Sequence, residues 1–383
     1  MVKNPFIISG AIPEPYFCDR RVESAKIIRT LTHGGNLCLI SPRRMGKSKL
    51  ISYCYGKPEL GDNYYTFYID ILHTSSLREF TYLFGQKVFE VLRSRSQRMF
   101  SALVQGLKSI NAKLGFDPLS NTPTFSLELG DIVQPEFTLA EIFACLEQAD
   151  KPCIVAFDEF QQIVYYPEKN IEALLRTHIQ QLGNVRFIFS GSERHIVSEM
   201  FLSSAKPFYN SATLLELFPI ALSEYTAFVK RGFTNFGKEI NEALVERVYH
   251  LFEGNTYYMQ KTFHEAFIDT MPGEECTLLT LRQEIDLLLD EAGNGYRLLL
   301  SRIPERQKEL LYAIAAEGNA QRIMSTSFIK RYALTSASAV QAAVRKLSEL
   351  DLLTITDGTY TVTDVLFRMY LLRLRNDSLV FLQ

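Results

Sequence analysis

Ile40-Ser41-Pro42-Arg43-Arg44-Met45-Gly46-Lys47-Ser48 is the stretch of sequence that decides the fold. It matches the phosphate-binding pattern G-x-x-x-x-G-K-S/T except at the first glycine, where Ser41 stands. Gly46 lets the backbone approach a phosphate closely, and N–H groups at the start of the following helix can form an anion-binding nest. We expect Lys47 to reach the β- and γ-phosphates and the Ser48 hydroxyl to bind Mg²⁺.

The segments on both sides of this loop fit the pattern. Leu37–Ile40 is a short apolar run, as in a buried parallel strand, and the residues from Ser48 to Tyr53 are suited to begin a helix. Strand, loop and helix in this order are the arrangement that a phosphate-binding loop requires. The alternative is an ordinary basic surface loop, which a second motif further along the chain disfavours.

The second motif is Ile154-Val155-Ala156-Phe157-Asp158-Glu159, an apolar strand that ends in two acids. We expect Asp158 to hold Mg²⁺, usually through water, and Glu159 to polarise a water in line with the γ-phosphate. Alone, this pattern also fits a strand that ends in a solvated acidic turn. Together with Lys47 and Ser48, it predicts a site that binds and hydrolyses a nucleoside triphosphate.

Length and composition exclude several classes of protein. A chain of 383 residues, 47% of them hydrophobic, predicts two or three domains with sizeable cores. No apolar run approaches the ~20 residues of a membrane span, and the N-terminus has no apolar segment of a signal peptide. The cysteines lack a C-x-x-C pair and the histidines lack metal-ligand spacing, which favours reduced thiols. We therefore expect a cytoplasmic protein with no membrane partner.

The first half of the chain alternates strands with helices, which predicts an α/β fold with a parallel sheet. The expected strands are 37–40, 64–70, 154–158 and 185–190, the expected helices are 77–107, 137–149 and 171–182, and 116–128 reads as a loop. Polar residues follow the strands, namely the phosphate loop, Asp70, Asp158 with Glu159, and Ser190. Because ligands bind beyond the carboxyl ends of parallel strands, these residues are expected to share one site.

The second half is helical and ends in a different pattern. Segments 222–231, 239–253, 255–270 and 279–291 have helical spacing and predict a small helical bundle. A helix from Phe328, a second from Ser336 to Leu350 and a hairpin around Asp357-Gly358 then predict a winged helix-turn-helix. We accordingly expect three domains, at 1–215, 216–295 and 296–383.

The predicted winged helix has the charge to contact either nucleic acid or protein. Residues 297–383 carry a net charge of +4, whereas the rest of the chain carries −6. The exposed face of the second helix is expected to include Ser338, Gln341, Arg345 and Lys346. Two basic residues on this face are few for a DNA-reading helix, so packing or protein contact remains an equal alternative.

Several motifs occur in an order that resembles the archaeal-type ATPases, a prokaryotic family placed near the STAND and AAA+ ATPases. These motifs are Asn4-Pro5-Phe6, Tyr16 to Arg20 with Glu23, Pro42 to Ser48, Asp158-Glu159-Phe160-Gln161, Ser190-Gly191-Ser192 and the lid motif Gly254 to Gln260. The resemblance covers nearly the whole chain. It implies an AAA+-like P-loop NTPase domain, a helical lid and a winged helix. It also implies that Phe6, Phe17 and Arg20 lie by the adenine and ribose, and that Ser190 or Ser192 is a polar sensor.

Three positions depart from the family pattern. Ser41 replaces the first loop glycine, and Thr256 replaces a proline of the lid motif. Ser211 stands where many members have an arginine. If that arginine acts as a finger in relatives, this chain lacks it, so nucleotide binding is a safer expectation than rapid turnover.

These features predict an ATP-binding switch with slow Mg²⁺-dependent hydrolysis, in which nucleotide biases the lid and winged helix. The expected catalytic residues are Glu159, Lys47 and Ser190, and the expected metal ligands are Ser48 and Asp158. The expected nucleotide-binding residues are Ser41, Pro42, Arg43, Arg44, Met45, Gly46, Lys47, Ser48, Lys49, Phe17 and Arg20. ATP, ADP and Mg²⁺ are the expected cofactors. Double-stranded DNA, a protein partner and self-association stay open as partners. The alternatives are an ADP- or ATP-bound scaffold whose winged helix contacts protein, and a DNA-binding regulator.

Overall fold

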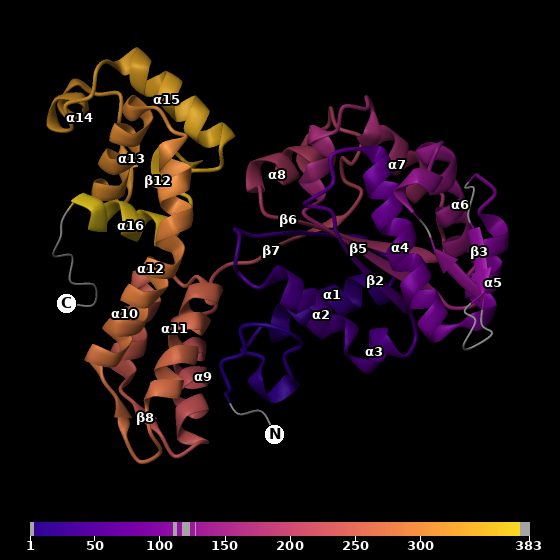
Figure 1. Ribbon diagram of the computed structural model, residues 1–383, viewed down its shortest axis with the longest axis horizontal. Coiled ribbons are helices and arrows are strands. Elements are labelled where there is room, and N and C mark those ends of the chain that lie inside the picture. The colour runs from indigo at the N-terminus through magenta and orange to yellow at the C-terminus, as the bar shows by residue number, and fades with distance from the viewer. Residues whose placement is uncertain (1–3, 110–112, 117–122, 127, 376–383) are drawn as a thin grey trace. The chain divides into compact units, whose positions relative to one another are not determined.

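The computed structural model describes residues 4–109, 113–116, 123–126 and 128–375 of the chain. They form two compact units. The sheet unit comprises Ala11–Glu14 and Arg20–Phe218, and the helical unit comprises the described parts of Met1–Gly10, Pro15–Asp19 and Pro219–Gln383. Figure 1 shows the strands of the first unit and the helices of the second.

The sheet unit is built on five strands in the order β2-β5-β6-β1-β7. All of these strands pair in parallel, which confirms the predicted parallel α/β sheet. Their bounds are β1 (Leu37–Ile40), β2 (Tyr65–Asp70), β5 (Cys153–Asp158), β6 (Val185–Gly191) and β7 (Thr213–Glu216). Since β1 lies between β6 and β7, the loop that follows β1 emerges next to the end of β6.

Helices cover both faces of this sheet (Figure 1). One face carries a core of phenylalanines, among them Phe67, Phe157, Phe187 and Phe189. The helices packed on it include α4 (Leu77–Arg95), α5 (Gln97–Gly106), α6 (Pro135–Glu147), α7 (Ile171–Ile179) and α8 (Arg194–Leu202). The other side carries α1 (Arg21–Thr32), α2 (Lys47–Tyr55) and α3 (Pro58–Gly61). Short 3₁₀ turns span Glu14–Tyr16 (η1), Leu129–Asp131 (η2) and Phe160–Tyr165 (η3).

Two local predictions in this unit are corrected. The helix expected over 77–107 is broken at Ser96. The Ser96 hydroxyl accepts a hydrogen bond from Met99 N and so caps the start of α5. The loop expected over 116–128 contains β4 (Pro123–Ser126), which pairs antiparallel with β3 (Lys113–Phe116). Residues 117–122 and 127 lie outside the described residues. Proline and asparagine in this segment favour a loop, but proline is tolerated at the first residue of a strand, which is the place of Pro123 in β4.

The helical unit begins with four helices and a short parallel strand pair. They are α9 (Leu222–Thr234), α10 (Glu242–Leu251), α11 (Thr256–Asp269) and α12 (Leu278–Ser301), with β8 (Glu239–Ile240) and β9 (Glu275–Cys276). The predicted bundle is therefore present. Helix α12 continues beyond the predicted bundle and leads directly into the last segment of the chain.

That last segment has winged-helix topology. It contains α13 (Glu305–Glu317), β10 (Ala320–Gln321), α14 (Thr326–Arg331), α15 (Ala337–Glu349), β11 (Leu353–Thr356), β12 (Thr359–Val362) and α16 (Val365–Arg375). The three strands form an antiparallel sheet in the order β10-β12-β11. Asp357 and Gly358 both have positive φ, at 50° and 75°, as the tight turn between paired strands requires.

The bundle and the winged helix share one apolar core within the helical unit. A single cluster of buried side chains runs from Phe6 through the bundle to Leu371. The boundary expected at 295/296 falls inside α12, and Tyr258 on α11 donates a hydrogen bond to Asp364 just before α16. The described part of the chain contains no helix that is both long and apolar enough to cross a membrane.

Candidate functional site

The phosphate-binding loop has the expected strand–loop–helix form. It leaves β1 at Ile40 and enters α2 at Lys47, with Gly46 in the N-cap position. Gly46 has φ 92°, in the left-handed region that favours glycine, and a Cβ there would meet nothing within 4 Å. The glycine is thus required by the backbone conformation, and the space beside it is open to a ligand.

The two sequence motifs meet at the carboxyl end of the sheet. Lys47 is almost fully buried, and its Nζ lies 3.5 Å from Glu159 Oε1. The Ser48 hydroxyl donates a 2.7 Å hydrogen bond to Asp158 Oδ2. Residues separated by more than a hundred positions in the chain therefore form one cluster, as we expect of a site that handles phosphate and a divalent cation.

Asp158 is held by three donors. Its Oδ2 accepts hydrogen bonds from Ser48 and from the Tyr68 hydroxyl, and its Oδ1 accepts one from Glu159 N at 3.1 Å. Burial raises the pKa of the carboxyl, but hydrogen bonds from Tyr68 and Ser48 and the positive charge of Lys47 together lower it below its usual value. Asp158 is therefore an anion at neutral pH.

Sequence reasoning missed Tyr68. It lies on β2, which pairs directly with β5 so that Tyr68 is opposite Ala156. This register brings the phenol to Asp158, two residues further along β5. The signal in the sequence was only a tyrosine two positions before Asp70, and the strand order was needed to interpret it.

Glu159 is fixed at the start of a turn by polar partners. Its Oε2 accepts hydrogen bonds from Gln161 Nε2 at 2.6 Å and from Ser192 Oγ at 2.5 Å. Arg43 Nε lies 3.5 Å from the same Ser192 hydroxyl. A Cβ on Gly191 would come within 2.4 Å of Val197 Cγ2 and 2.5 Å of Gln161 Oε1, so the glycine at this position makes room for both side chains.

Ser192, rather than Ser190, contacts the carboxylate of Glu159. Ser190 is fully buried, and its hydroxyl forms no hydrogen bond of ordinary geometry with a described residue. It is nevertheless near enough to Asp158 to help lower the pKa of that carboxyl. The two serines of the 190–192 motif thus face different acids of the site.

The remaining loop residues divide by burial. Ser41, in place of the glycine, is buried, and its hydroxyl donates to the Pro42 carbonyl at 3.0 Å. Met45 is buried and Lys49 is half-buried, whereas Pro42, Arg43 and Arg44 are exposed. Ser41 therefore satisfies its hydroxyl within the loop without changing the strand–loop–helix form.

The structure places Arg20 in the sheet unit and Phe17 in the helical unit. Arg20 precedes α1 with φ 63°, and its Nη1 contacts Glu23 Oε1 at 2.7 Å. Its Nη2 is buried and has no hydrogen-bond partner among the described residues. The approach of Phe17 and Arg20 to an adenine and ribose stays a prediction.

The acidic residues at this end of the sheet fit a magnesium ion that is also bound by phosphate. Mg²⁺ commonly takes one or two carboxylates together with phosphate and water oxygens, and Ser48 and Asp158 offer an adjacent hydroxyl and carboxylate. Within the described residues, no cluster of three or more His, Cys, Asp or Glu side chains is placed to hold a metal. Asp70 lies nearby, and burial together with the charges of Asp158 and Glu159 raises its pKa.

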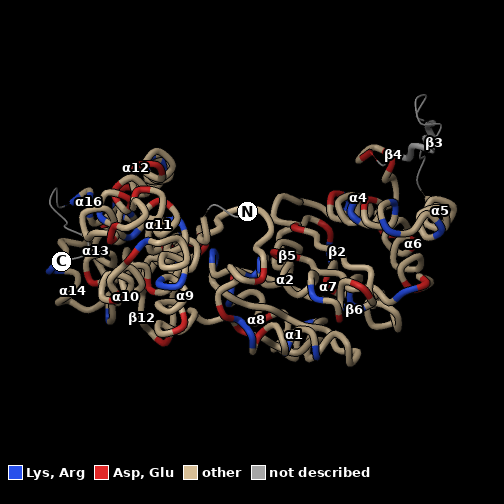
Figure 2. The backbone as a smooth tube through the Cα atoms, turned by 90° about the horizontal axis from the view of Figure 1, so that it is seen from below, with Lys and Arg blue, Asp and Glu red and all other residues tan. Residues whose placement is uncertain are grey.

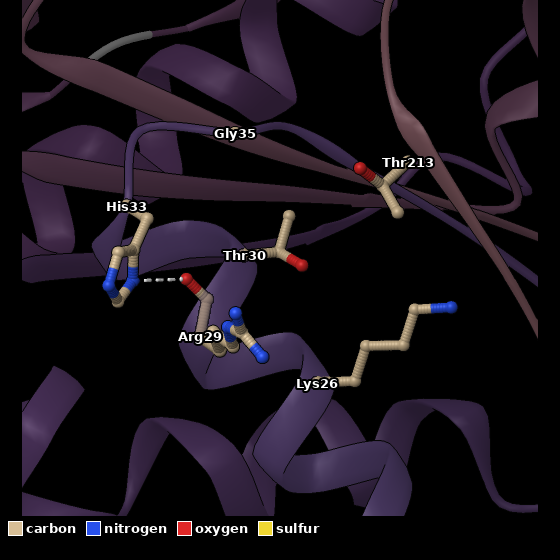
Figure 3. Close-up of a pocket in the computed structure, with 6 residues that line it drawn as sticks. All are labelled: Lys26, Arg29, Thr30, His33, Gly35 and Thr213. Carbon is tan, nitrogen blue, oxygen red and sulfur yellow. Dashed lines mark hydrogen bonds between the residues drawn. The ribbon is translucent and has the colours of Figure 1, made fainter.

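A separate open hollow lies at the other end of the strands. It has a volume of about 540 Å³ and is lined by Lys26, Arg29, Thr30, His33, Gly35 and Thr213 (Figure 3). Thr213 pairs with Leu37, the first residue of β1, whereas the phosphate loop follows Ile40, the last. The hollow is therefore distinct from the Lys47–Asp158 cluster.

The position of the family arginine is occupied by a structural serine. Ser211 Oγ donates to the Phe208 carbonyl at 2.7 Å and stabilises the turn before β7. Phe208 is fully buried in the phenylalanine core. Ser211 can neither carry a positive charge nor neutralise phosphate.

The second helix of the helix-turn-helix, α15, presents the expected polar face. Ser338, Gln341, Arg345 and Lys346 are all exposed. Both cations pair with Glu349 on the same helix, at 3.1 Å and 2.7 Å. Figure 2 shows both basic and acidic positions on the helices of the helical unit. The face is polar and exposed, but its charge is partly neutralised.

Comparison with known proteins identifies the family of the chain. The sequence model described as an ATPase domain predominantly from Archaea matches residues 17–262, and that of a probable winged helix domain matches residues 294–373. No curated protein matches the chain.

Solved structures share the fold at low sequence identity. A Walker-type ATPase of Pyrococcus abyssi is similar with a TM-score of 0.63 and 20% identity, over 96% of this chain and 99% of that chain. The Orc2 protein of Aeropyrum pernix, solved in ADPNP and ADP complexes, gives 0.60 and 13% over 98% of both chains. The Orc1 protein of the same organism, solved with DNA, gives 0.51 and 11% over 97% of this chain and 96% of that chain.

Proposed function

Because this chain belongs to the family of ATPase domains found predominantly in Archaea, we propose that it is an ATP-binding switch that hydrolyses ATP slowly with Mg²⁺. One observation carries the proposal. Lys47 and Ser48 at the start of α2 contact Glu159 and Asp158 at the end of β5. A cation, a hydroxyl and two carboxylates thus lie beside the open backbone of Gly46.

Each of these residues has a separate role in the proposed reaction. Lys47 and the N–H groups after Gly46 bind the phosphates, while Ser48 and Asp158 hold Mg²⁺. The metal ion supplies charge neutralisation on the phosphate oxygens. Glu159 orients the attacking water, and Ser192 and Gln161 fix its carboxylate. Ser190, on the neighbouring strand β6, helps to lower the pKa of the Asp158 carboxyl.

Slow turnover is supported by two features of the site. Both oxygens of the Glu159 carboxylate already have partners, Lys47 at Oε1 and Gln161 with Ser192 at Oε2, so an attacking water competes with them. Ser211 cannot supply the positive charge of an arginine finger, whose contribution to phosphoryl transfer is about 10³- to 10⁵-fold. We therefore expect bound ATP to be hydrolysed slowly.

The switch is proposed to act through the helical unit as one body. Tyr258 lies within the lid motif and donates a hydrogen bond to Asp364 of the winged helix at 2.7 Å. Arg368 on α16 pairs with Glu253, next to the lid glycine Gly254. Because lid and winged helix share a core and these ties, a nucleotide that biases the lid also biases the winged helix.

Duplex DNA is the partner that we propose for the winged helix. The exposed face of α15 carries Gln341, Arg345 and Lys346, which suit contacts with base edges and phosphates. The similar Orc1 protein was solved in complex with DNA. The second candidate is a nucleotide-bound scaffold whose winged helix contacts protein, and the pairing of Arg345 and Lys346 with Glu349 favours it.

The bound nucleotide and its fate test this proposal. Protein purified without added nucleotide is denatured, and the released small molecule is identified by mass spectrometry. The protein is then given ATP and Mg²⁺ under single-turnover conditions. We expect adenine nucleotide and a slow release of phosphate. Retained ADP without phosphate release would favour the scaffold, and the absence of both would contradict the nucleotide assignment.

A further inference from the structure

Asp158 shares one of its carboxylate oxygens between two hydroxyl donors. Oδ2 accepts hydrogen bonds from Ser48 on α2 and from Tyr68 on β2. The other oxygen, Oδ1, accepts from the backbone N–H of Glu159. Asp158 is almost fully buried and Tyr68 is half-buried, whereas Ser48 is exposed, so water can replace the Ser48 donor more easily than the Tyr68 donor.

Building on the proposed function, we propose that Tyr68 is a positioning residue that orients the Asp158 carboxylate for Mg²⁺. Strand order creates the contact, because β2 and β5 are neighbours and Tyr68 is in register with Ala156. The phenol thus reaches, from the neighbouring strand, the same carboxylate oxygen that accepts from Ser48. No sequence motif includes this tyrosine.

The hydroxyl groups of Ser48 and Tyr68 would have different roles when a cation binds. Ser48 would turn a lone pair of its oxygen toward Mg²⁺, so its position would be set by the metal as well as by Asp158. Tyr68 donates to this carboxylate without being a metal ligand itself, and Ser190 lies near it without a hydrogen bond of ordinary geometry. Carboxylates at metal sites are commonly oriented in this way, and loss of such a partner typically weakens metal binding about 10- to 100-fold.

The contact can be removed without changing packing. Tyr68→Phe keeps the ring and deletes only the hydroxyl. Tyr65→Phe is the matched control, since Tyr65 lies on the same strand and donates to Asp150 Oδ1 at 3.1 Å. Tyr65 is opposite Cys153, at the other end of β5, so its loss leaves Asp158 untouched.

The experiment is a calorimetric titration of ADP with and without Mg²⁺, followed by a Mg²⁺ titration of the ADP-bound protein. We expect Tyr68→Phe to bind ADP without Mg²⁺ as tightly as wild type. Its apparent Mg²⁺ affinity should fall about 10- to 100-fold, while Tyr65→Phe keeps the wild-type value.

The possible outcomes separate the two claims. If wild type and Tyr68→Phe bind ADP with the same dependence on Mg²⁺, the proposed role of Tyr68 is wrong, while the proposed function stands. An equal loss of ADP affinity without Mg²⁺, or the same loss in Tyr65→Phe, would assign Tyr68 a merely structural role. Wild type that binds no adenine nucleotide would overturn the proposed function, and this inference with it.

Discussion

Lys47 Nζ lies 3.5 Å from Glu159 Oε1, so the cation expected to bind phosphate and the carboxylate expected to orient water form an ion pair. Their side chains are only 6% and 14% exposed, so solvent screens the pair weakly. A bound γ-phosphate would compete with Glu159 for Lys47. Removing the carboxylate charge should therefore lower the rate of hydrolysis without weakening ATP binding.

Glu159→Gln tests this relationship. The amide preserves size and hydrogen bonding but cannot act as a base, so we expect phosphate release to fall by ~10²-fold or more. ATP affinity should be maintained or increased, because Lys47 is released for phosphate. Glu193→Gln is the control, since Glu193 accepts from Tyr165 outside the network. Equal phosphate release by wild type and Glu159→Gln would show that Glu159 has no catalytic role.

Thr256→Pro should stabilise the helical unit. Thr256 is the first residue of α11, a position where proline is favoured and the N–H has no partner within the helix. Asn255 before it has ψ 107°, an extended conformation that a following proline tolerates. The Thr256 hydroxyl is buried without a hydrogen-bond partner among the described residues, so little is lost.

We expect a gain of about 0.4–1 kcal/mol, because proline restricts the unfolded chain. Thermal unfolding followed by circular dichroism should show a midpoint about 1–4 °C higher. Thr256→Ala separates loss of the hydroxyl from the effect of the ring. A lower midpoint for Thr256→Pro would mean that the backbone at this position cannot accept the ring.

Glu284 should make the stability of the helical unit depend on pH. Burial, and then the nearby Asp269 carboxylate, raise the pKa of the Glu284 carboxyl to about 7. The pKa of Glu284 in the folded protein therefore exceeds its pKa in the unfolded chain. The contribution of this carboxyl to the free energy of unfolding is complete at pH values below the unfolded pKa. That contribution is lost as pH rises through about 7.

Glu284→Gln removes this titration. We expect the variant to gain unfolding temperature relative to wild type at pH 8 and to gain little at pH 5. Glu239→Gln is the control, since Glu239 is exposed on β8. A difference between Glu284→Gln and wild type that is the same at both pH values would contradict the raised pKa.

Replacing Arg345 and Lys346 tests the winged-helix surface. If α15 contacts duplex DNA, the double alanine variant should bind more weakly, and its salt dependence should flatten by roughly one unit per lost phosphate contact. Fluorescence anisotropy over a salt series, with and without ATP, measures both quantities. Lys230→Ala with Lys261→Ala removes equal charge from α9 and α11, where both lysines pair with glutamates. If wild type binds duplex DNA weakly and the α15 double variant binds it equally weakly, a protein partner is favoured.

Local pattern was sufficient to predict the phosphate loop. The apolar run to Ile40, the positive φ of Gly46 and the helix from Lys47 all depend on neighbouring residues, and all are present. The winged helix was predictable for the same reason, since Asp357-Gly358 specifies its own turn.

Contacts that depend on strand order were not predictable. Tyr68 reaches Asp158 only because β2 lies beside β5, and nothing in either strand specifies that neighbour. The choice of Ser192 over Ser190 as partner of Glu159 depends on where β6 ends relative to β5. The shared core of lid and winged helix depends on helix packing around α12 rather than on local sequence.

The central claim is that the Lys47–Asp158 cluster binds adenine nucleotide, and isothermal titration calorimetry of wild type and Lys47→Ala tests it most directly. We expect wild type to bind ADP and ATP. Lys47→Ala should weaken both by about 10- to 150-fold, which corresponds to about 1.5–3 kcal/mol for a charged hydrogen bond. Lys57→Ala, which removes a lysine paired with Glu14 in the same unit, should bind as wild type does. Wild type that binds no adenine nucleotide at millimolar concentration, or Lys47→Ala with unchanged affinity, would contradict the claim.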